Sequence, residues 1–123
     1  MYDISIADAD RLVVVRLGGL MSVEEVDRYM AELGRTMAAH RLTADYRLIV
    51  DVIDCPIQTQ AVIDRMREHM AAAPRAAAIA VVTASSLARM QIRRLFQQPY
   101  ARVVSTLAEA RAWVLKGEEP LAA

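Results

Sequence analysis

Runs of hydrophobic residues near the start of the chain change from strand-like to helix-like spacing. Tyr2 to Ile6 and Leu12 to Leu17 predict two strands, and the Asp8-Ala9-Asp10 segment between them is typical of a hairpin turn. From Val23 to Ala39 the apolar residues recur every three or four positions, which predicts a helix with one buried stripe. The chain therefore opens with a hairpin followed by a helix.

Two helix starts carry a capping signal. Ser22 and Glu25, and later Thr106 and Glu109, have the three-residue spacing of a capping box. In this motif each side chain accepts a hydrogen bond from a free backbone N–H group in the first turn. We therefore expect helices to begin directly after Ser22 and Thr106, with both side chains of each pair engaged.

Strands and helices alternate from Tyr46 onward. Leu48 to Val52 and Ala76 to Thr83 are apolar without alternation, which is typical of strands covered by helices on both faces. The remaining predicted elements are a helix that starts between Pro56 and Gln60 and ends near Ala73, a helix from Ser85 or Ser86 to about Gln97, a strand from Arg102 to Ser105, and a helix from Leu107 that Gly117 ends.

The element order is β-β-α-β-α-β-α-β-α, which predicts an α/β fold with a mixed five-stranded sheet and helices packed on it. At 123 residues we expect a single domain over residues 1–117, followed by a flexible tail over residues 118–123. Functional groups in such folds gather where parallel strands end, so the segments after Asp51 and Thr83 are the first places to search.

Composition narrows the classes of partner. Fifteen basic and fifteen acidic residues give no net charge, which argues against nucleic acid and allows at most peripheral membrane contact. The single cysteine fits a reducing compartment. The first residues lack the pattern of a secretory signal, and the longest uncharged run, residues 76–88, is too short for a membrane span. We therefore expect a cytoplasmic protein.

Two predicted loops carry candidate binding residues. Asp54, Cys55 and Thr59 follow the central strand, and Ser85 and Ser86 follow the next one. A helix N-terminus can lower the pKa of a thiol, but no histidine lies near Cys55 in the sequence to act as a base, and lone cysteines commonly pack as small hydrophobes. The two serines are typical helix caps, and the segment lacks the glycines that let a backbone wrap a phosphate.

Two predicted helices add apolar and basic candidates. The helix that ends near Ala73 has a stripe of Ile57, Ala61, Ile63, Met66 and Met70, in which the flexible methionines suit either a core or a variable ligand. In the next helix, Leu87 and Met90 lie outside the expected core face and beside Arg89 and Arg93. That mixture suits a partner surface, the lid of an apolar pocket, or a solvated basic face.

Four segments carry a family resemblance: Gly19-Leu20-Met21-Ser22, Leu48-Ile49-Val50-Asp51, residues 75–82 and residues 109–114. With the element order, they resemble the STAS domain of bacterial anti-sigma factor antagonists, and more closely the SpoIIAA-like group of that fold. The resemblance implies a non-enzymatic binding or regulatory module. Antagonists of this type are switched by phosphorylation of a serine after the third strand, where Thr59 is the only hydroxyl here and the one candidate for phosphorylation.

Three hypotheses follow. The preferred one is a module that recognises a protein partner through the loop after the third strand and the second and third helices, with a homodimer as one form of it. The alternative is a carrier or sensor of a small apolar or lipid-like ligand, held between the sheet and those two helices. An enzyme with Cys55 as nucleophile ranks last, and we expect no cofactor and no metal site.

Overall fold

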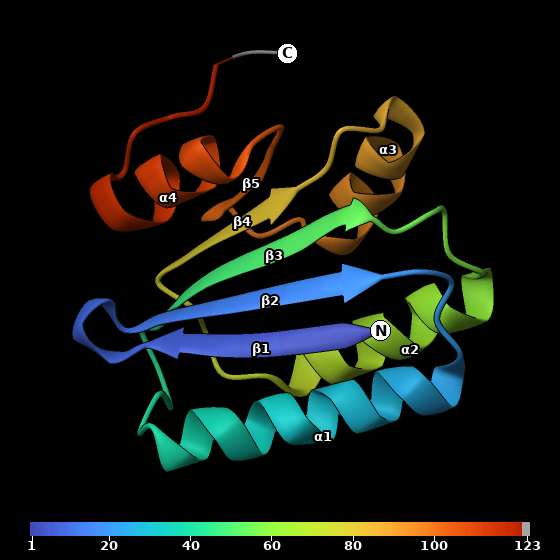
Figure 1. Cartoon of the computed structure of the whole chain (residues 1–123), viewed down its shortest axis with the longest axis horizontal. Coiled ribbons are helices and arrows are strands. Elements are labelled where there is room, and N and C mark those ends of the chain that lie inside the picture. Colours follow the sequence, from blue (N-terminus) through green and yellow to red (C-terminus); the bar gives the residue numbers. More distant parts are fainter. Residues whose placement is uncertain (122–123) are drawn as a thin grey trace.

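The structure is a computed structural model, and it describes residues 1–121. Figure 1 shows a sheet with helices on both sides of it. In chain order the elements are β1 (Tyr2–Ala7), the short 3-10 helix η1 (Asp8–Asp10), β2 (Leu12–Gly18), α1 (Val23–Ala39), β3 (Arg47–Asp54), α2 (Gln60–Ala72), β4 (Ala78–Val82), α3 (Ser86–Leu95), β5 (Ala101–Val104) and α4 (Leu107–Lys116).

The five strands lie in sequence order, with β3 in the middle of the sheet (Figure 1). β1 pairs with β2 antiparallel, as expected for a hairpin, and the other three pairs are parallel. One row of the sheet runs through Val15, Val50, Val81 and Val103. The mixed α/β sheet predicted from the sequence is confirmed, and the apolar runs of β3 and β4 are its interior.

Alternate residues of each strand point to opposite faces, and the two faces have different cores. Leu12, Ile49, Ala80 and Val104 pack under α4 on one face. The opposite face, which carries Val50 in the middle strand, packs toward α1, α2 and α3. α4 lies close against β3, β4 and β5, whereas α1 and α2 lie closest to each other.

The second helix begins late, and this changes its buried face. Thr59 is the N-cap of α2, and the segment before it is loop, since Pro56 lies there and does not continue a helix. Ile57 and Ala61 are exposed, so their predicted place in the core is wrong. The buried residues of α2 are Val62, Ile63 and Met66, with Met70 half-buried.

The capping boxes form only in part. The Ser22 hydroxyl accepts a hydrogen bond from the Glu25 N–H group at 3.1 Å, as predicted, but the Glu25 carboxylate accepts one from the Met1 ammonium group at 2.6 Å instead. Thr106 caps α4 in the same way, while Glu109 accepts from the Ser105 N–H group. The prediction for each hydroxyl is correct, because the hydroxyl caps the helix that begins directly after it. Each carboxylate instead accepts a hydrogen bond from a donor other than the predicted one.

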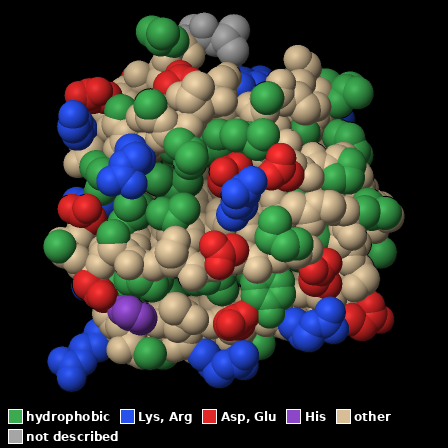
Figure 2. All heavy atoms as spheres, viewed as in Figure 1, with side chains coloured by type: hydrophobic (Ala, Val, Ile, Leu, Met, Phe, Trp, Pro, Cys, Tyr) green, Lys and Arg blue, Asp and Glu red, His purple; other side chains and the backbone are tan. Residues whose placement is uncertain are grey.

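The last described residues cross back toward the sheet. Glu119 accepts two hydrogen bonds from the Arg102 guanidinium group, both at 2.8 Å. Residues 122–123 of the predicted tail lie outside the described part of the chain. Within residues 1–121, no helix combines the length and the apolar character needed to cross a membrane. Figure 2 shows acidic and basic side chains mixed over the viewed face, as the balanced charge implies.

Candidate functional site

A cavity of about 640 Å³ lies between the sheet and helices α1, α2 and α3. Its floor is the apolar face of the sheet, which contributes Leu17, Leu48, Val50, Val52, Ile79 and Val81. Natural small-molecule sites have volumes of about 300–1,000 Å³ and mostly apolar linings. The cavity therefore has the size and the chemistry of a ligand site.

Four of the helix residues that line the cavity are small. α1 contributes Gly34, the end of α2 contributes Ala71 and Ala72, and α3 contributes Ala88. Protein interiors are otherwise packed as densely as organic crystals. Of the four, Ala88 is buried in the layer between helix and sheet, whereas Gly34, Ala71 and Ala72 are exposed at its edge.

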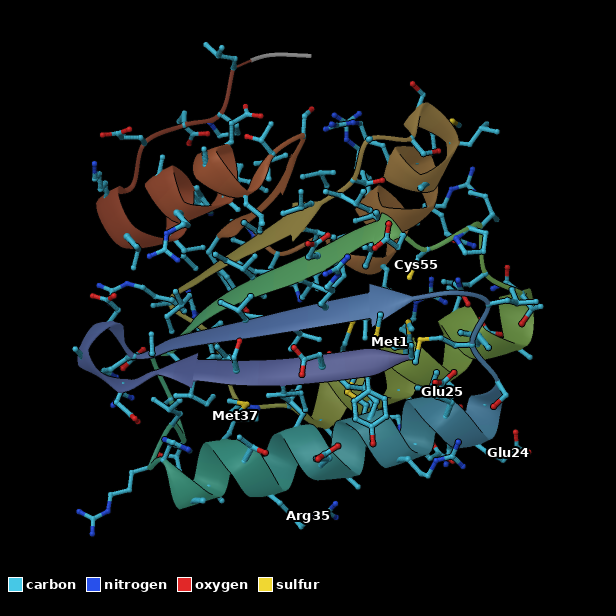
Figure 3. All side chains as sticks on the ribbon, viewed as in Figure 1. Met1, Glu24, Glu25, Arg35, Met37 and Cys55 are labelled. Carbon is cyan, nitrogen blue, oxygen red and sulfur yellow. The ribbon has the colours of Figure 1, made fainter. Side chains whose placement is uncertain are left out.

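Methionines form much of the remaining lining. Five of the seven methionines in the chain line the cavity, namely Met21, Met30, Met37, Met66 and Met70. The flexible thioether of methionine fits apolar surfaces of different shapes. Figure 3 shows Met37 on the side of α1 that faces the sheet, near the end of that helix. The cavity wall is therefore adaptable.

The loop after β3 closes the cavity where the parallel strands end. The Gln58 N–H group donates to the Gln91 side-chain oxygen at 3.2 Å, and the Gln91 amide donates back to the Gln58 carbonyl at 3.1 Å. The Met21 N–H group donates to the Gln58 side chain at 2.9 Å. These bonds join the loop to α3 and to the segment before α1. Figure 3 places Cys55 at this end, just beyond β3.

The opposite end, where the parallel strands begin, meets solvent. Residues 71–75, at the end of α2 and directly after it, line the cavity and are exposed. The Tyr46 hydroxyl donates to the Pro74 carbonyl at 2.8 Å, which holds this segment against the start of β3. The Arg75 guanidinium group lies over the Tyr100 ring, 5.0 Å from its centroid. The arginine of the lining, Arg75, therefore lies at this end of the cavity.

Cys55 lines the cavity and is half-buried. Burial raises its pKa above the ordinary value of 9.0, and the nearby carboxylates of Asp54 and Asp51 act in the same direction. α2 begins only at Gln60, so Cys55 does not lie at a helix N-terminus, the position that would lower its pKa. The Cys55 thiol is therefore part of the cavity wall, and its surroundings do not activate it as a nucleophile.

Neither histidine supplies a base to Cys55. His40 pairs with Asp8 at 2.6 Å, and His69 pairs with Asp27 at 2.8 Å. Within residues 1–121, no hydrogen bond joins Cys55 to either ring, and no group of three or more histidine, cysteine or acidic residues is placed to hold a metal ion.

Four of the other predicted site residues have structural partners. Asp54 pairs with Arg16 at 2.6 Å. The Thr59 hydroxyl accepts from the Val62 N–H group at 3.3 Å and caps α2, while Ser85 caps α3 by accepting from the Ala88 N–H group at 3.1 Å. Arg89 donates to the Val103 carbonyl and to the Ser105 hydroxyl, so it is bound to the end of β5.

The outer face of α3 is separate from the cavity. Leu87 and Met90 are 68% and 56% exposed, as their place outside the core stripe predicts. Ser86 and Arg93 are exposed on the same helix. None of these four residues lines the cavity within the described chain. Of the eleven predicted site residues, the structure brings together Cys55, Met66 and Met70.

Neither the contribution of α1 nor the solvent-facing end of the cavity was predicted from the sequence. Met30 and Met37 of α1 line the cavity beside Met66 and Met70 of α2, so the site is not confined to the second and third helices. The apolar stripe of α1 could have indicated this contribution, because it adds Met30 and Met37 to a set of five methionines, which is many for one core. Arg75 carried no such signal, since it follows Pro74 in a loop.

No family model matches the chain, and no curated protein gives a significant match to it. Among solved structures, it is similar to the anti-sigma factor antagonist SpoIIAA in its unphosphorylated form, with a TM-score of 0.55. The match covers 89% of this chain and 94% of that chain, at 20% sequence identity. The chain has a SpoIIAA-like fold. The fold-level resemblance seen in the sequence is thereby confirmed, and the SpoIIAA-like sheet is the floor of the cavity.

Proposed function

We propose that this protein is a non-enzymatic binding module that holds a small apolar ligand between the sheet and helices α1 to α3. The observation that supports the proposal is the cavity of about 640 Å³ beneath adaptable methionines. A void of this size forfeits the packing contacts that stabilise an ordinary core. A bound apolar molecule restores those contacts.

The gain from filling the space is substantial. Each methylene group moved from water into an apolar site contributes about 0.8 kcal/mol. The sheet face supplies aliphatic side chains, such as Val50 and Val81, and the roof supplies thioethers, so a chain-like ligand meets apolar contacts on both sides. The half-buried thiol of Cys55 adds no charge to this surface, because its raised pKa keeps it protonated at neutral pH.

Cys55 provides the test, because it is the only cysteine in the chain and it lines the cavity. The rate of alkylation by N-ethylmaleimide is measured with increasing dodecanol, an uncharged chain-like probe. A matched control is the double variant Cys55→Ser, Leu87→Cys, in which the thiol lies on the outer face of α3. The proposal predicts that dodecanol slows alkylation at position 55 and leaves position 87 unchanged. Equal rates at position 55 with and without saturating dodecanol would overturn it.

A protein partner is the second candidate, and the exposed Leu87 and Met90 favour it. Large apolar side chains grouped on a surface are a common mark of an interface. The structural neighbour SpoIIAA is an antagonist of an anti-sigma factor, which is a role exerted on another protein. Thr59 is exposed beside the loop after β3 and stays the predicted phosphorylation site of such a module.

A photo-crosslinking amino acid at position 90 in cells tests the partner hypothesis, with the same group at position 111 on α4 as control. An adduct of discrete mass from position 90 alone supports a partner at α3, and an adduct of twice the chain mass identifies a homodimer. Absence of any adduct from position 90, or equal adducts from both positions, contradicts the hypothesis.

A further inference from the structure

We infer that the ligand carries one anionic head group, which Arg75 binds at the open end of the cavity while a single apolar chain fills the interior. The inference rests on the proposed function, since it names the class of the ligand. It is argued from the charges of the lining and from the way Arg75 is held.

Arg75 is the one lysine or arginine among the described residues that line the cavity. Arg75 and His69 line the cavity, and no aspartate or glutamate of residues 1–121 does. His69 is already paired with Asp27 at 2.8 Å. Arg75 forms no ion pair with a carboxylate of the described chain. One unpaired cation therefore lies at the rim of an apolar space, and this arrangement favours an anion over a cation.

The backbone around Arg75 is held in place before any ligand arrives. The Arg75 carbonyl accepts a hydrogen bond from the Asp45 N–H group at 3.1 Å, and the Ala77 N–H group donates to the Tyr46 carbonyl at 2.7 Å. The Tyr46 hydroxyl holds Pro74 at 2.8 Å. One residue on each side of the arginine, as well as the arginine's own carbonyl, is thus bound to the residues directly before β3, which limits the entropy lost on binding.

The guanidinium group is also oriented. Its Cζ atom lies over the Tyr100 ring, 5.0 Å from the ring centroid, in a cation–π contact. The N–H donors at the edge of the guanidinium remain available, and their planar fork matches the oxygens of a carboxylate or a phosphate. The group that Arg75 recognises is therefore an oxyanion. The experiment below distinguishes a carboxylate from a phosphate.

The position of Arg75 fits an amphipathic molecule. Residues 71–75 form an exposed stretch of the lining, so a head group there stays in contact with water while its chain lies among Met37, Met66 and Met70. This avoids the high cost of burying a charge in an apolar interior. At the other end, the mutual hydrogen bonds of Gln58 and Gln91 offer no cation. A ligand with one charged end therefore enters with its chain first.

Displacement of the neutral fluorescent probe N-phenyl-1-naphthylamine from the full chain tests the inference. The competitors share one chain and differ in the head group: dodecanoic acid and dodecyl phosphate, both ionised, dodecanol, and the dodecyltrimethylammonium cation. The ionic competitors are kept below their micelle concentrations and dodecanol below its solubility limit. The variants are Arg75→Gln, Arg75→Lys, which keeps the charge, and Arg111→Gln, which removes an exposed arginine from α4 on the other face of the sheet.

We expect the two acids to displace the probe at lower concentration than dodecanol, and the cation to be the weakest. Arg75→Gln raises the concentration needed for the acids by about tenfold, the value of one charge-assisted hydrogen bond at a solvated site, and changes dodecanol by less than about twofold. Arg75→Lys gives an intermediate value, and Arg111→Gln gives the wild-type one. The more potent acid identifies the head group as carboxylate or phosphate.

Two other results have distinct meanings. If acids and dodecanol displace the probe equally, or if Arg75→Gln affects all competitors alike, the head-group inference is wrong and the proposed function stands. If the wild-type chain does not bind the probe and no competitor protects Cys55, the proposed function fails, and the inference fails with it.

Discussion

Asp27 on α1 accepts two hydrogen bonds from Arg65 on α2, with Nε 2.7 Å from Oδ1 and Nη2 3.2 Å from Oδ2. His69 Nε2 lies 2.8 Å from the same Oδ1. α1 and α2 form the part of the roof that carries most of the cavity methionines. The carboxylate therefore joins the two helices whose separation from the sheet creates the site.

This clamp gives a pH-dependent prediction for Asp27→Asn. The hydrogen bonds from Arg65, and then those from His69, lower the pKa of Asp27 from 3.8 to about 2. A lowered pKa contributes stability that is present above the unfolded value and is lost as the pH falls through the folded value. The melting temperature of Asp27→Asn is therefore expected to lie below that of the wild type above pH 3.8, and the difference is expected to shrink toward pH 2.

Asp64→Asn is the matched control, because Asp64 pairs with Arg67 and Gln60 within α2 alone. Thermal unfolding followed by circular dichroism across the acid range measures both variants. A pH-independent difference for Asp27→Asn, or the same profile for both variants, contradicts the role of Asp27 as the link between the helices.

The environment of Cys55 predicts slow thiol chemistry at neutral pH. Burial, together with Asp54 and Asp51, raises the pKa of the thiol above 9.0. Because the thiolate is the reactive form, the alkylation rate in the absence of ligand should increase with pH to a midpoint above 9.0. Stopped-flow alkylation against pH measures it, with free cysteine as the reference. A midpoint below the reference contradicts the environment described for this residue and restores the enzyme hypothesis.

The two faces of the sheet predict opposite effects for the same substitution. Ala88 on α3 lines the cavity, whereas Ala110 on α4 is fully buried against β3 to β5. Ala88→Leu adds carbon to open space, so the free energy of unfolding is expected to stay level or to rise by up to about 1 kcal/mol. Ala110→Leu overpacks a filled core and is expected to lower the free energy of unfolding by about 1–3 kcal/mol.

Urea denaturation of the two variants measures this difference. The same Ala88→Leu substitution should also weaken displacement by dodecanol, because the added side chain occupies ligand space. Equal destabilisation by both substitutions contradicts the presence of a hollow layer on one face only.

The fold could be predicted from the sequence because its signals are local. The apolar runs around Val50 and Val81 are long enough to identify interior strands, and the hydroxyls of Ser22 and Thr106 mark helix starts without knowledge of the tertiary structure. The start of α2 was less certain, since Ile57 and Ala61 continue a helical spacing that Pro56 and the Thr59 cap interrupt.

The cavity could not be predicted in the same way, because its lining residues come from segments that are far apart in the sequence. Gly34, Ala72 and Ala88 lie on three different helices and give no combined signal along the chain. The contact of Arg75 with Tyr100, a residue from a later part of the chain, could not be predicted from the residues around Arg75. Cys55 and Met66 were predicted as site residues because they lie on the loop and the helix that the sheet topology brings to one place.

The methionines allow the central claim to be tested directly. Met21, Met30, Met37, Met66 and Met70 line the cavity, whereas Met1 and Met90 do not and are 54% and 56% exposed. NMR spectra of protein labelled with ¹³C at the methionine methyl groups, recorded during titration with dodecanoic acid, therefore contain five reporters and two internal controls. The account predicts that the five cavity signals shift together and saturate while those of Met1 and Met90 stay in place. Shifts confined to Met90, or no shift of the five signals, would contradict it.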